Sequence, residues 1–140
     1  STACIRKCDR GGEIVPMDEK KKTQLNYKAR LKVFREGTSF GPGTAQLMEL
    51  IEETSSLAES CVRMGMAYSK GWKILKRAED DLGIQLIVST RGGRSGGRTE
   101  LTDKGRIFLL AYRNMEKEMN QTLENAFLKY FGKMEENEGE

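Results

Sequence analysis

Apolar residues recur at helical spacing through the middle of the chain. The pattern predicts three helices, over residues 44–53, 57–64 and 68–81. Thr44 offers an N-cap for the first helix, and Gly65 permits a sharp turn between the second and the third. Two short helices followed, after a tight turn, by a longer helix are typical of the helix-turn-helix unit.

The third predicted helix has two different faces. Its expected core positions share one apolar face, with Ile74 at the edge: Gly71, Leu75, Ala78 and Leu82. The opposite face carries hydroxyl and basic side chains, at Tyr68, Ser69, Lys70, Lys73, Lys76 and Arg77. Since the second helix of such a unit enters the major groove, we expect these six residues to bind DNA; a merely solvated basic face is the alternative. The acidic residues 79–81 oppose the helix dipole, so tertiary packing must hold this helix.

A period of two residues appears on either side of the helices and predicts strands. Before them, apolar residues alternate with basic ones and indicate a strand over 27–35, with one face formed by Tyr27, Ala29, Leu31 and Val33. After them, residues 84–101 predict a two-stranded hairpin with a glycine-rich tip. We expect this hairpin to be a wing whose arginines contact the DNA backbone or minor groove: Arg91, Arg94 and Arg98.

A long helix is expected from Thr102, its N-cap, to about residue 133. Its apolar stripe recurs at steps of three and four residues, at Phe108, Tyr112, Met115, Met119, Leu123 and Phe127. A helix of about thirty residues is about 45 Å long, which exceeds what one small domain covers. We therefore predict a dimerisation seam, with packing inside one chain as the alternative.

The predicted fold class is mainly α with a small β component: a winged helix-turn-helix with a long C-terminal dimerisation helix. The expected organisation is a flexible arm (1–25), a DNA-binding domain (26–101), the dimerisation helix (102–134) and an acidic tail (135–140). The net charge of +3 is modest, but the chain runs from basic to acidic, and local clusters of Lys and Arg attract phosphate more than the average suggests.

Composition excludes several function classes. The chain has no histidine and only three cysteines, Cys4, Cys8 and Cys61, so neither a structural zinc site nor a histidine base is available. We expect no metal, no cofactor and no enzyme activity, although Cys4 and Cys8 as reactive or metal-binding residues between subunits remain an alternative. No apolar run is long enough to span a bilayer and no signal peptide is evident, so a cytoplasmic protein is expected.

Two single residues have competing interpretations. Trp72 is expected to pack partly against the wing or the N-terminal strand, because large aromatics dominate packing; contact with DNA is the alternative. Cys61 is expected to be an inert buried residue, and a redox switch is the alternative.

Three motifs together resemble a known family. They are the segment Gly65-Met-Ala-Tyr-Ser-Lys-Gly-Trp72, the Gly-Gly-x-x-Gly-Gly hairpin tip and the step Leu101-Thr-Asp-Lys-Gly105. Over about residues 27–125 the chain resembles the N-terminal DNA-binding domain of ModE-type molybdate-responsive regulators, which is related to the winged helix of LysR-type regulators. The resemblance implies a homodimer, joined mainly through its helical segments, that binds double-stranded DNA through the third helix and a flexible wing.

The resemblance stops at the long helix. Full-length family members carry C-terminal domains that bind molybdate, and no second globular segment follows here, so molybdate binding is assigned to no residue. Two alternatives to a DNA-binding regulator stay open. One is a winged-helix module that binds another protein, because fold does not fix function. The other is a regulator that responds to an effector, such as molybdate or another oxyanion.

Overall fold

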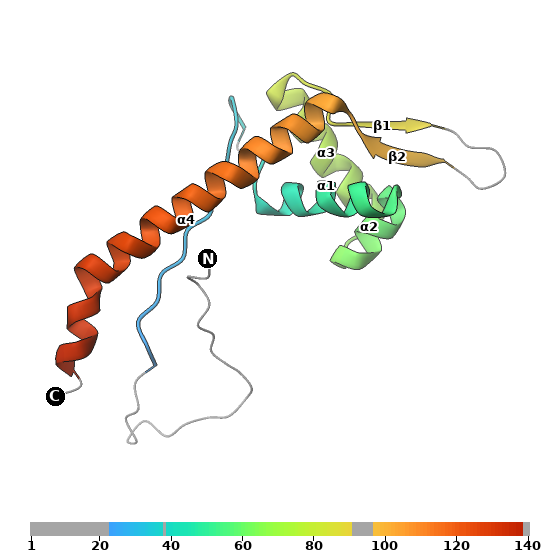
Figure 1. Cartoon of the computed structure of the whole chain (residues 1–140). Coiled ribbons are helices and arrows are strands. Elements are labelled where there is room, and N and C mark those ends of the chain that lie inside the picture. Colours follow the sequence, from blue (N-terminus) through green and yellow to red (C-terminus); the bar gives the residue numbers. More distant parts are fainter. Residues whose placement is uncertain (1–22, 38, 91–96, 139–140) are drawn as a thin grey trace. The chain divides into compact units, whose positions relative to one another are not determined.

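The structure is a computed structural model that describes residues 23–37, 39–90 and 97–138. It forms two compact units, one of Arg30–Asn114 and one that combines segments of Ser1–Ala29 and Met115–Glu140. Figure 1 shows the elements in chain order: α1 (Pro42–Thr54), α2 (Leu57–Met64), α3 (Tyr68–Leu82), β1 (Ile87–Thr90), β2 (Arg98–Leu101) and α4 (Asp103–Glu138). The architecture is mainly helical with one small antiparallel sheet, as predicted.

Helix α1 begins at Pro42, and the predicted N-cap at Thr44 is wrong. Proline is favoured in the first turn because it has no backbone N–H to satisfy there and its φ is already helical. The N-cap is Gly41, which makes no side-chain hydrogen bond. Thr44 lies inside the helix, where its Oγ1 donates to the Ser39 carbonyl at 3.4 Å.

Helix α2 has the predicted bounds, because strong local signals mark both of its ends. Ser56 caps its start and accepts the Glu59 N–H at 3.0 Å. Gly65 ends it with φ 71°, a left-handed conformation that favours glycine, and donates to the Val62 carbonyl at 3.0 Å. The sharp turn predicted between α2 and α3 is thus confirmed.

The core of the Arg30–Asn114 unit gathers side chains from every element. Phe40 is fully buried, and its ring lies 4.8 Å from that of Phe108 and 5.1 Å from that of Tyr112. The Tyr112 hydroxyl donates to the Leu31 carbonyl at 2.8 Å. The first turns of α4 are therefore part of this core. Its other buried members are Ala45, Leu47, Met48, Ile51, Leu57, Cys61, Leu75, Ala78, Leu82, Leu86 and Leu101.

The predicted hairpin is confirmed. Strands β1 and β2 pair antiparallel, with Ile87 opposite Leu101 and Thr90 opposite Arg98. The N–H of Thr99 donates to the Ser55 carbonyl at 3.0 Å and so fastens β2 to the turn between α1 and α2.

The strand predicted over residues 27–35 is wrong. The described backbone there forms one isolated bridge, between Val33 and Phe40, and no ladder. Leu31 and Val33 are partly buried against the core, whereas Lys32 between them is exposed. The alternation therefore comes from an extended segment with one face on the core, which produces the same period as a paired strand.

The junction between β2 and α4 explains the motif Leu-Thr-x-x-Gly. Thr102 caps α4, as predicted: its Oγ1 accepts the Gly105 N–H at 2.8 Å and donates to the Gln85 carbonyl at 2.6 Å. A Cβ on Gly105 would overlap the Leu86 carbonyl oxygen, so only glycine permits this close approach.

In the second unit, the Tyr27 ring lies 4.8 Å from that of Phe127, and Phe127 lies 5.5 Å from Phe131. Helix α4 continues to Glu138, five residues beyond its expected end. Residues 1–22, with Cys4 and Cys8, lie outside the described residues.

Candidate nucleic-acid interface

Helix α3 buries the stripe that its periodicity predicted. Gly71, Leu75, Ala78 and Leu82 are buried, and Ile74 is partly buried. A Cβ on Gly71 would overlap the Cys61 sulfur, so glycine lets α2 and α3 pack closely. The side chains opposite this stripe are all exposed. We call them the α3 outer face: Tyr68, Ser69, Lys70, Lys73, Lys76 and Arg77.

Most cations of the α3 outer face have no partner within the described part of the chain. Lys70, Lys73 and Arg77 make no ion pair with a described residue. Lys76 differs, because its Nζ lies 3.6 Å from Glu79 Oε1 and 5.9 Å from the centre of the Trp72 ring. Lys76 is therefore partly neutralised.

The start of α3 adds positive potential to the same face. Its N-cap is Ala67, which makes no side-chain hydrogen bond, and its first turn holds no acidic residue. The positive end of the helix dipole therefore has no side-chain compensation near Tyr68 and Ser69. An anion such as a phosphate is favoured at a helix start of this kind.

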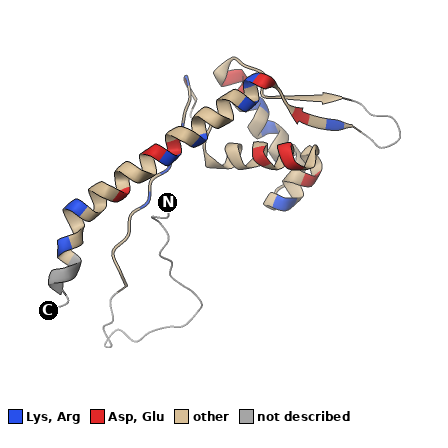
Figure 2. Ribbon diagram, viewed as in Figure 1, with Lys and Arg blue, Asp and Glu red and all other residues tan. Residues whose placement is uncertain are grey.

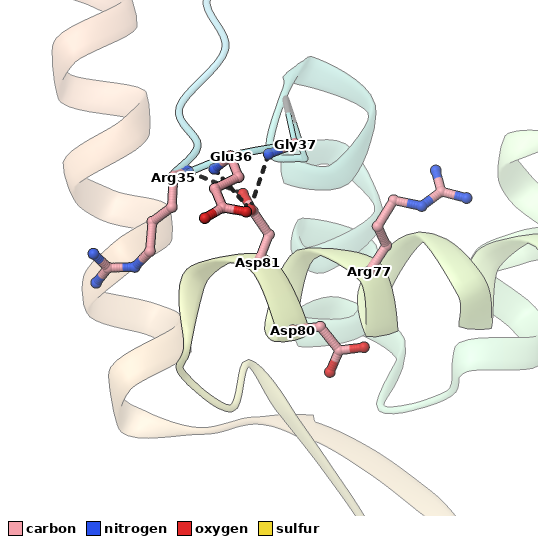
Figure 3. Close-up of a pocket in the computed structure, with 6 residues that line it drawn as sticks. All are labelled: Arg35, Glu36, Gly37, Arg77, Asp80 and Asp81. Atoms are coloured by element: carbon pink, nitrogen blue, oxygen red, sulfur yellow. Dashed lines mark hydrogen bonds between the residues drawn. The ribbon is translucent and has the colours of Figure 1, made fainter.

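The other end of α3 is fastened by Asp81 (Figure 3). Its carboxylate accepts three backbone N–H groups, from Arg35 at 3.0 Å, Glu36 at 2.9 Å and Gly37 at 3.0 Å, and the Ser39 hydroxyl at 2.8 Å. These donors, the Arg35 N–H foremost, hold the pKa of the Asp81 carboxyl well below its usual value. The loop before α1 is thereby attached to the end of α3.

Glu79 fastens the same helix to the hairpin. Its Oε2 accepts the Leu86 N–H at 2.8 Å and the Ile87 N–H at 3.1 Å. Since β1 begins at Ile87, this carboxylate fixes the start of the hairpin against α3. The sequence identified the acidic residues 79–81 only as unfavourable for the dipole; the structure shows that two of them are connectors.

Of the predicted wing arginines, only Arg98 lies among the described residues; Arg91 and Arg94 do not. Arg98 is exposed on β2, with its guanidinium 2.9 Å from Glu100 and 3.3 Å from the Ser55 Oγ. To bind a phosphate, Arg98 has to exchange these partners.

Helix α1 carries acidic residues, which appear red along its ribbon in Figure 2. Their carboxylates are paired with arginines of α2 and α4, at 3.2, 3.1 and 2.9 Å: Glu53 with Arg63, Glu52 with Arg106, and Glu49 with Arg113. These three arginines are therefore partly neutralised, in contrast to Lys70 and Lys73.

The predicted dimerisation residues have different surroundings. Phe108 and Tyr112 pack in the core of their own chain, and Tyr112, 2% exposed, offers almost no surface to a partner. This packing accounts for their place in the apolar stripe. Met115 is 55% exposed, while Met119, Leu123 and Phe127 are partly exposed.

The described residues contain no group of three or more histidine, cysteine, aspartate or glutamate side chains arranged to hold a metal ion. Cys61 is 1% exposed, and burial raises the pKa of its thiol, which favours the unreactive protonated form. Within the same part of the chain no helix is long and apolar enough to cross a bilayer.

Comparisons with known proteins find relatives at low identity. No protein-family model matches the chain. The chain is 29% identical over 103 residues to the molybdenum transport protein ModE of Azotobacter vinelandii, which covers 73% of this chain and 38% of that protein. It is 26% identical over 82 residues to the molybdenum-pterin-binding protein MopB of Rhodobacter capsulatus, with 59% and 30% covered.

The chain thus spans about a third of the length of these curated relatives. A solved structure of a mutant ZitR from Lactococcus lactis matches at 16% identity and a TM-score of 0.49, over 87% of this chain and 80% of that one. The chain is accordingly a low-identity relative of the ModE and MopB proteins.

Proposed function

We propose that this chain is a transcription regulator that binds a specific DNA sequence as a dimer. The observation that carries the proposal is the α3 outer face, where Lys70, Lys73 and Arg77 are exposed and make no ion pair with a described residue. Homology to a ModE protein at low identity supports the same function. In the complex, α3 enters the major groove, and its first residues, Tyr68 and Ser69, meet the base edges.

The hairpin contributes a second, weaker contact. Its position is fixed by Glu79 and by the Thr99–Ser55 hydrogen bond, so the hairpin is presented together with α3. Arg98 exchanges Glu100 for a phosphate, and Arg91 and Arg94 bind the backbone or the minor groove beside it.

Helix α4 supplies the dimer contact in this proposal. Its half that belongs to the second unit exposes several large apolar side chains, which the partner chain covers in this proposal. They are Met115 at 55%, Leu128 at 59%, Tyr130 at 63%, Phe131 at 41% and Met134 at 56%. Together with Met119, Leu123 and Phe127 they form the proposed seam. Two recognition helices then meet half-sites about 34 Å, or a multiple of that, apart.

A gel-shift titration against salt tests the DNA contact. The probe is the duplex that the wild-type protein enriches from a random library. Removing two cations with Lys73→Ala and Arg94→Ala should weaken binding and reduce the salt dependence by about 0.9 for each phosphate that is no longer neutralised. The matched control, Lys28→Ala with Lys117→Ala, removes two exposed cations outside α3, the hairpin and the seam, changes the net charge equally and should bind as the wild type does.

Equal affinities for the two double variants would reject these DNA contacts. Salt-insensitive binding to another protein, with no duplex enriched, would instead favour a protein-interaction module.

For the dimer, Met115→Glu should yield monomers in sedimentation equilibrium without unfolding, because Met115 is exposed. A dimer that persists would place the seam elsewhere.

A response to an oxyanion is a second proposal, supported by the homology to ModE and MopB proteins. Calorimetric titration with molybdate and with tungstate tests it. We assign no residue of this chain to such binding.

A further inference from the structure

Trp72 lies on α3 at the edge of the α3 outer face and is 46% exposed. It shares a shallow hollow with the start of the hairpin, which Ile87, Val88 and Ser89 also line. Val88 is 41% exposed. An aromatic ring and a branched aliphatic side chain thus form an exposed apolar step between α3 and β1.

The Trp72 ring is linked to the hairpin through Lys76 and Glu79. Lys76 Nζ lies 5.9 Å from the ring centre, within range of a cation–π interaction, and 3.6 Å from Glu79. Glu79 in turn accepts the N–H groups of Leu86 and Ile87. The ring, the ammonium group and the strand are therefore connected, and contacts that exist before binding reduce its entropy cost.

The surroundings indicate which ligand chemistry suits this step. The hollow measures about 240 Å³, less than the roughly 300–1,000 Å³ of small-molecule sites. Its apolar surface lies beside the exposed cations Lys73 and Lys76. The fitting ligand is a polyanion that also carries small apolar groups. In DNA these are the C5-methyl group of thymine, the apolar group on the base edges of the major groove, and the deoxyribose.

We infer that Trp72, with Val88 beside it, makes an apolar contact with a nucleotide at the edge of the bound groove and so contributes to DNA specificity. The inference rests on the proposed DNA-binding function. It assigns a DNA contact to Trp72, for which the sequence favoured partial packing against the wing or the N-terminal strand.

Trp72 is the single tryptophan of the chain, so its fluorescence reports on this contact in the unmodified protein. Adding the enriched duplex should shift or quench the emission in proportion to binding. Trp72→Ala should weaken binding roughly tenfold, the size of an ordinary interface hot spot. The matched control is Phe34→Ala, because Phe34 is an aromatic residue of nearly equal exposure, 47%, that lies outside α3 and the hairpin. It should bind as the wild type does.

Replacing each thymine of the duplex in turn with uracil shows whether Trp72 contacts the thymine methyl group or the deoxyribose. A position at which uracil weakens wild-type binding about fourfold, the effect of one methyl group, but leaves Trp72→Ala binding unchanged assigns the contact to the thymine methyl group. Weaker binding of Trp72→Ala with no uracil effect assigns it to the deoxyribose. Circular dichroism checks that the variant is folded.

Two results have different consequences. Unchanged Trp72 emission when the wild type is saturated with duplex overturns the inference and leaves the DNA-binding function intact. A wild-type protein that enriches no duplex at all rejects the proposed function itself.

Discussion

Helix α3 carries basic residues in its first turns and acidic residues in its last turn, which is the reverse of what a helix dipole favours. At the acidic end the chain itself compensates: Asp81 accepts three N–H groups and a hydroxyl, and Glu79 accepts two N–H groups. At the basic end, Lys70 and Lys73 have no ion-pair partner among the described residues. The negative charges at the end of α3 are therefore balanced by donors of the same chain, whereas Lys70 and Lys73 at its start are not balanced by a described residue.

This difference separates folding from binding within one helix. The carboxylates at the end of α3 connect it to the loop before α1 and to the hairpin, so they stabilise the unit. The cations at the start do not stabilise the folded chain and are available to an anionic partner. Substitutions at the end of α3 should therefore change the stability of the fold, and substitutions at its start should change DNA binding.

The largest effect on stability is expected where α3 packs on α2. In Gly71→Ala the new Cβ overlaps the buried Cys61 sulfur, and such overpacking costs about 1–3 kcal/mol, against a gain of about 1 kcal/mol in helix propensity. Urea unfolding should show a net decrease in stability. Cys61→Ala in the same chain should restore part of it, which a double-mutant cycle measures. Gly43→Ala, at a position with open space, is the control and should not destabilise.

A smaller decrease in stability is expected when the Asp81 clamp is removed. We use this name for the four hydrogen bonds that the Asp81 carboxylate accepts from the loop before α1. Asp81→Ala leaves three backbone N–H groups and the Ser39 hydroxyl to water, so the midpoint of urea unfolding should fall. The neighbouring Asp80 is exposed and has no hydrogen bond to a described residue (Figure 3). Asp80→Ala should leave the midpoint unchanged or raise it slightly, because it removes a negative charge from the helix C-terminus. Equal effects of the two substitutions would contradict the clamp.

How far the sequence predicted these features depends on how local they are. The bounds of α2 and the buried stripe of α3 follow from periodicity and from Ser56 and Gly65, which act within one turn. The partners of Asp81 lie more than forty residues away, and no spacing rule connects them. Helical periodicity also cannot distinguish a stripe that packs within the chain, as at Tyr112, from one that faces a partner.

The predicted strand over residues 27–35 and the predicted N-cap at Thr44 are wrong for related reasons. Alternation around Leu31 indicates one buried face, and a strand is only one way to bury it. For α1, Pro42 was the available signal, since proline marks a first turn more strongly than Thr44 marks a cap. Helical periodicity places Trp72 on the exposed side of α3, and partial packing against the wing was one of its expected surroundings. Its place beside β1 could not be predicted in detail, because it depends on how Glu79 holds the hairpin.

The clamp also predicts how stability depends on pH. Hydrogen bonding lowers the pKa of Asp81 in the folded chain below its usual value of about 4. A group with a lowered folded pKa stabilises the fold above its unfolded pKa, and this contribution decreases as the pH falls below that value. Wild-type stability should therefore drop more steeply below about pH 4 than that of Asp81→Asn, which does not titrate. Parallel curves between about pH 5 and about pH 2.5 would show that Asp81 is not the group responsible.

The smallest effect on stability, and the clearest on binding, is expected at Lys73. Because Lys73 is exposed and makes no ion pair with a described residue, Lys73→Ala should change the free energy of unfolding by no more than about 0.5 kcal/mol. The same substitution should weaken binding to the enriched duplex and reduce its salt dependence by about 0.9.

Lys76→Ala should weaken binding less, since Lys76 already contacts Glu79 and Trp72 and must give up part of those contacts to reach a phosphate. The two variants remove the same charge from adjacent turns of one helix, so they differ mainly in whether the cation has a partner. If Lys76→Ala weakened binding more than Lys73→Ala, the unpaired cations would not be the ones that bind DNA, and the division between the two ends of α3 would not hold.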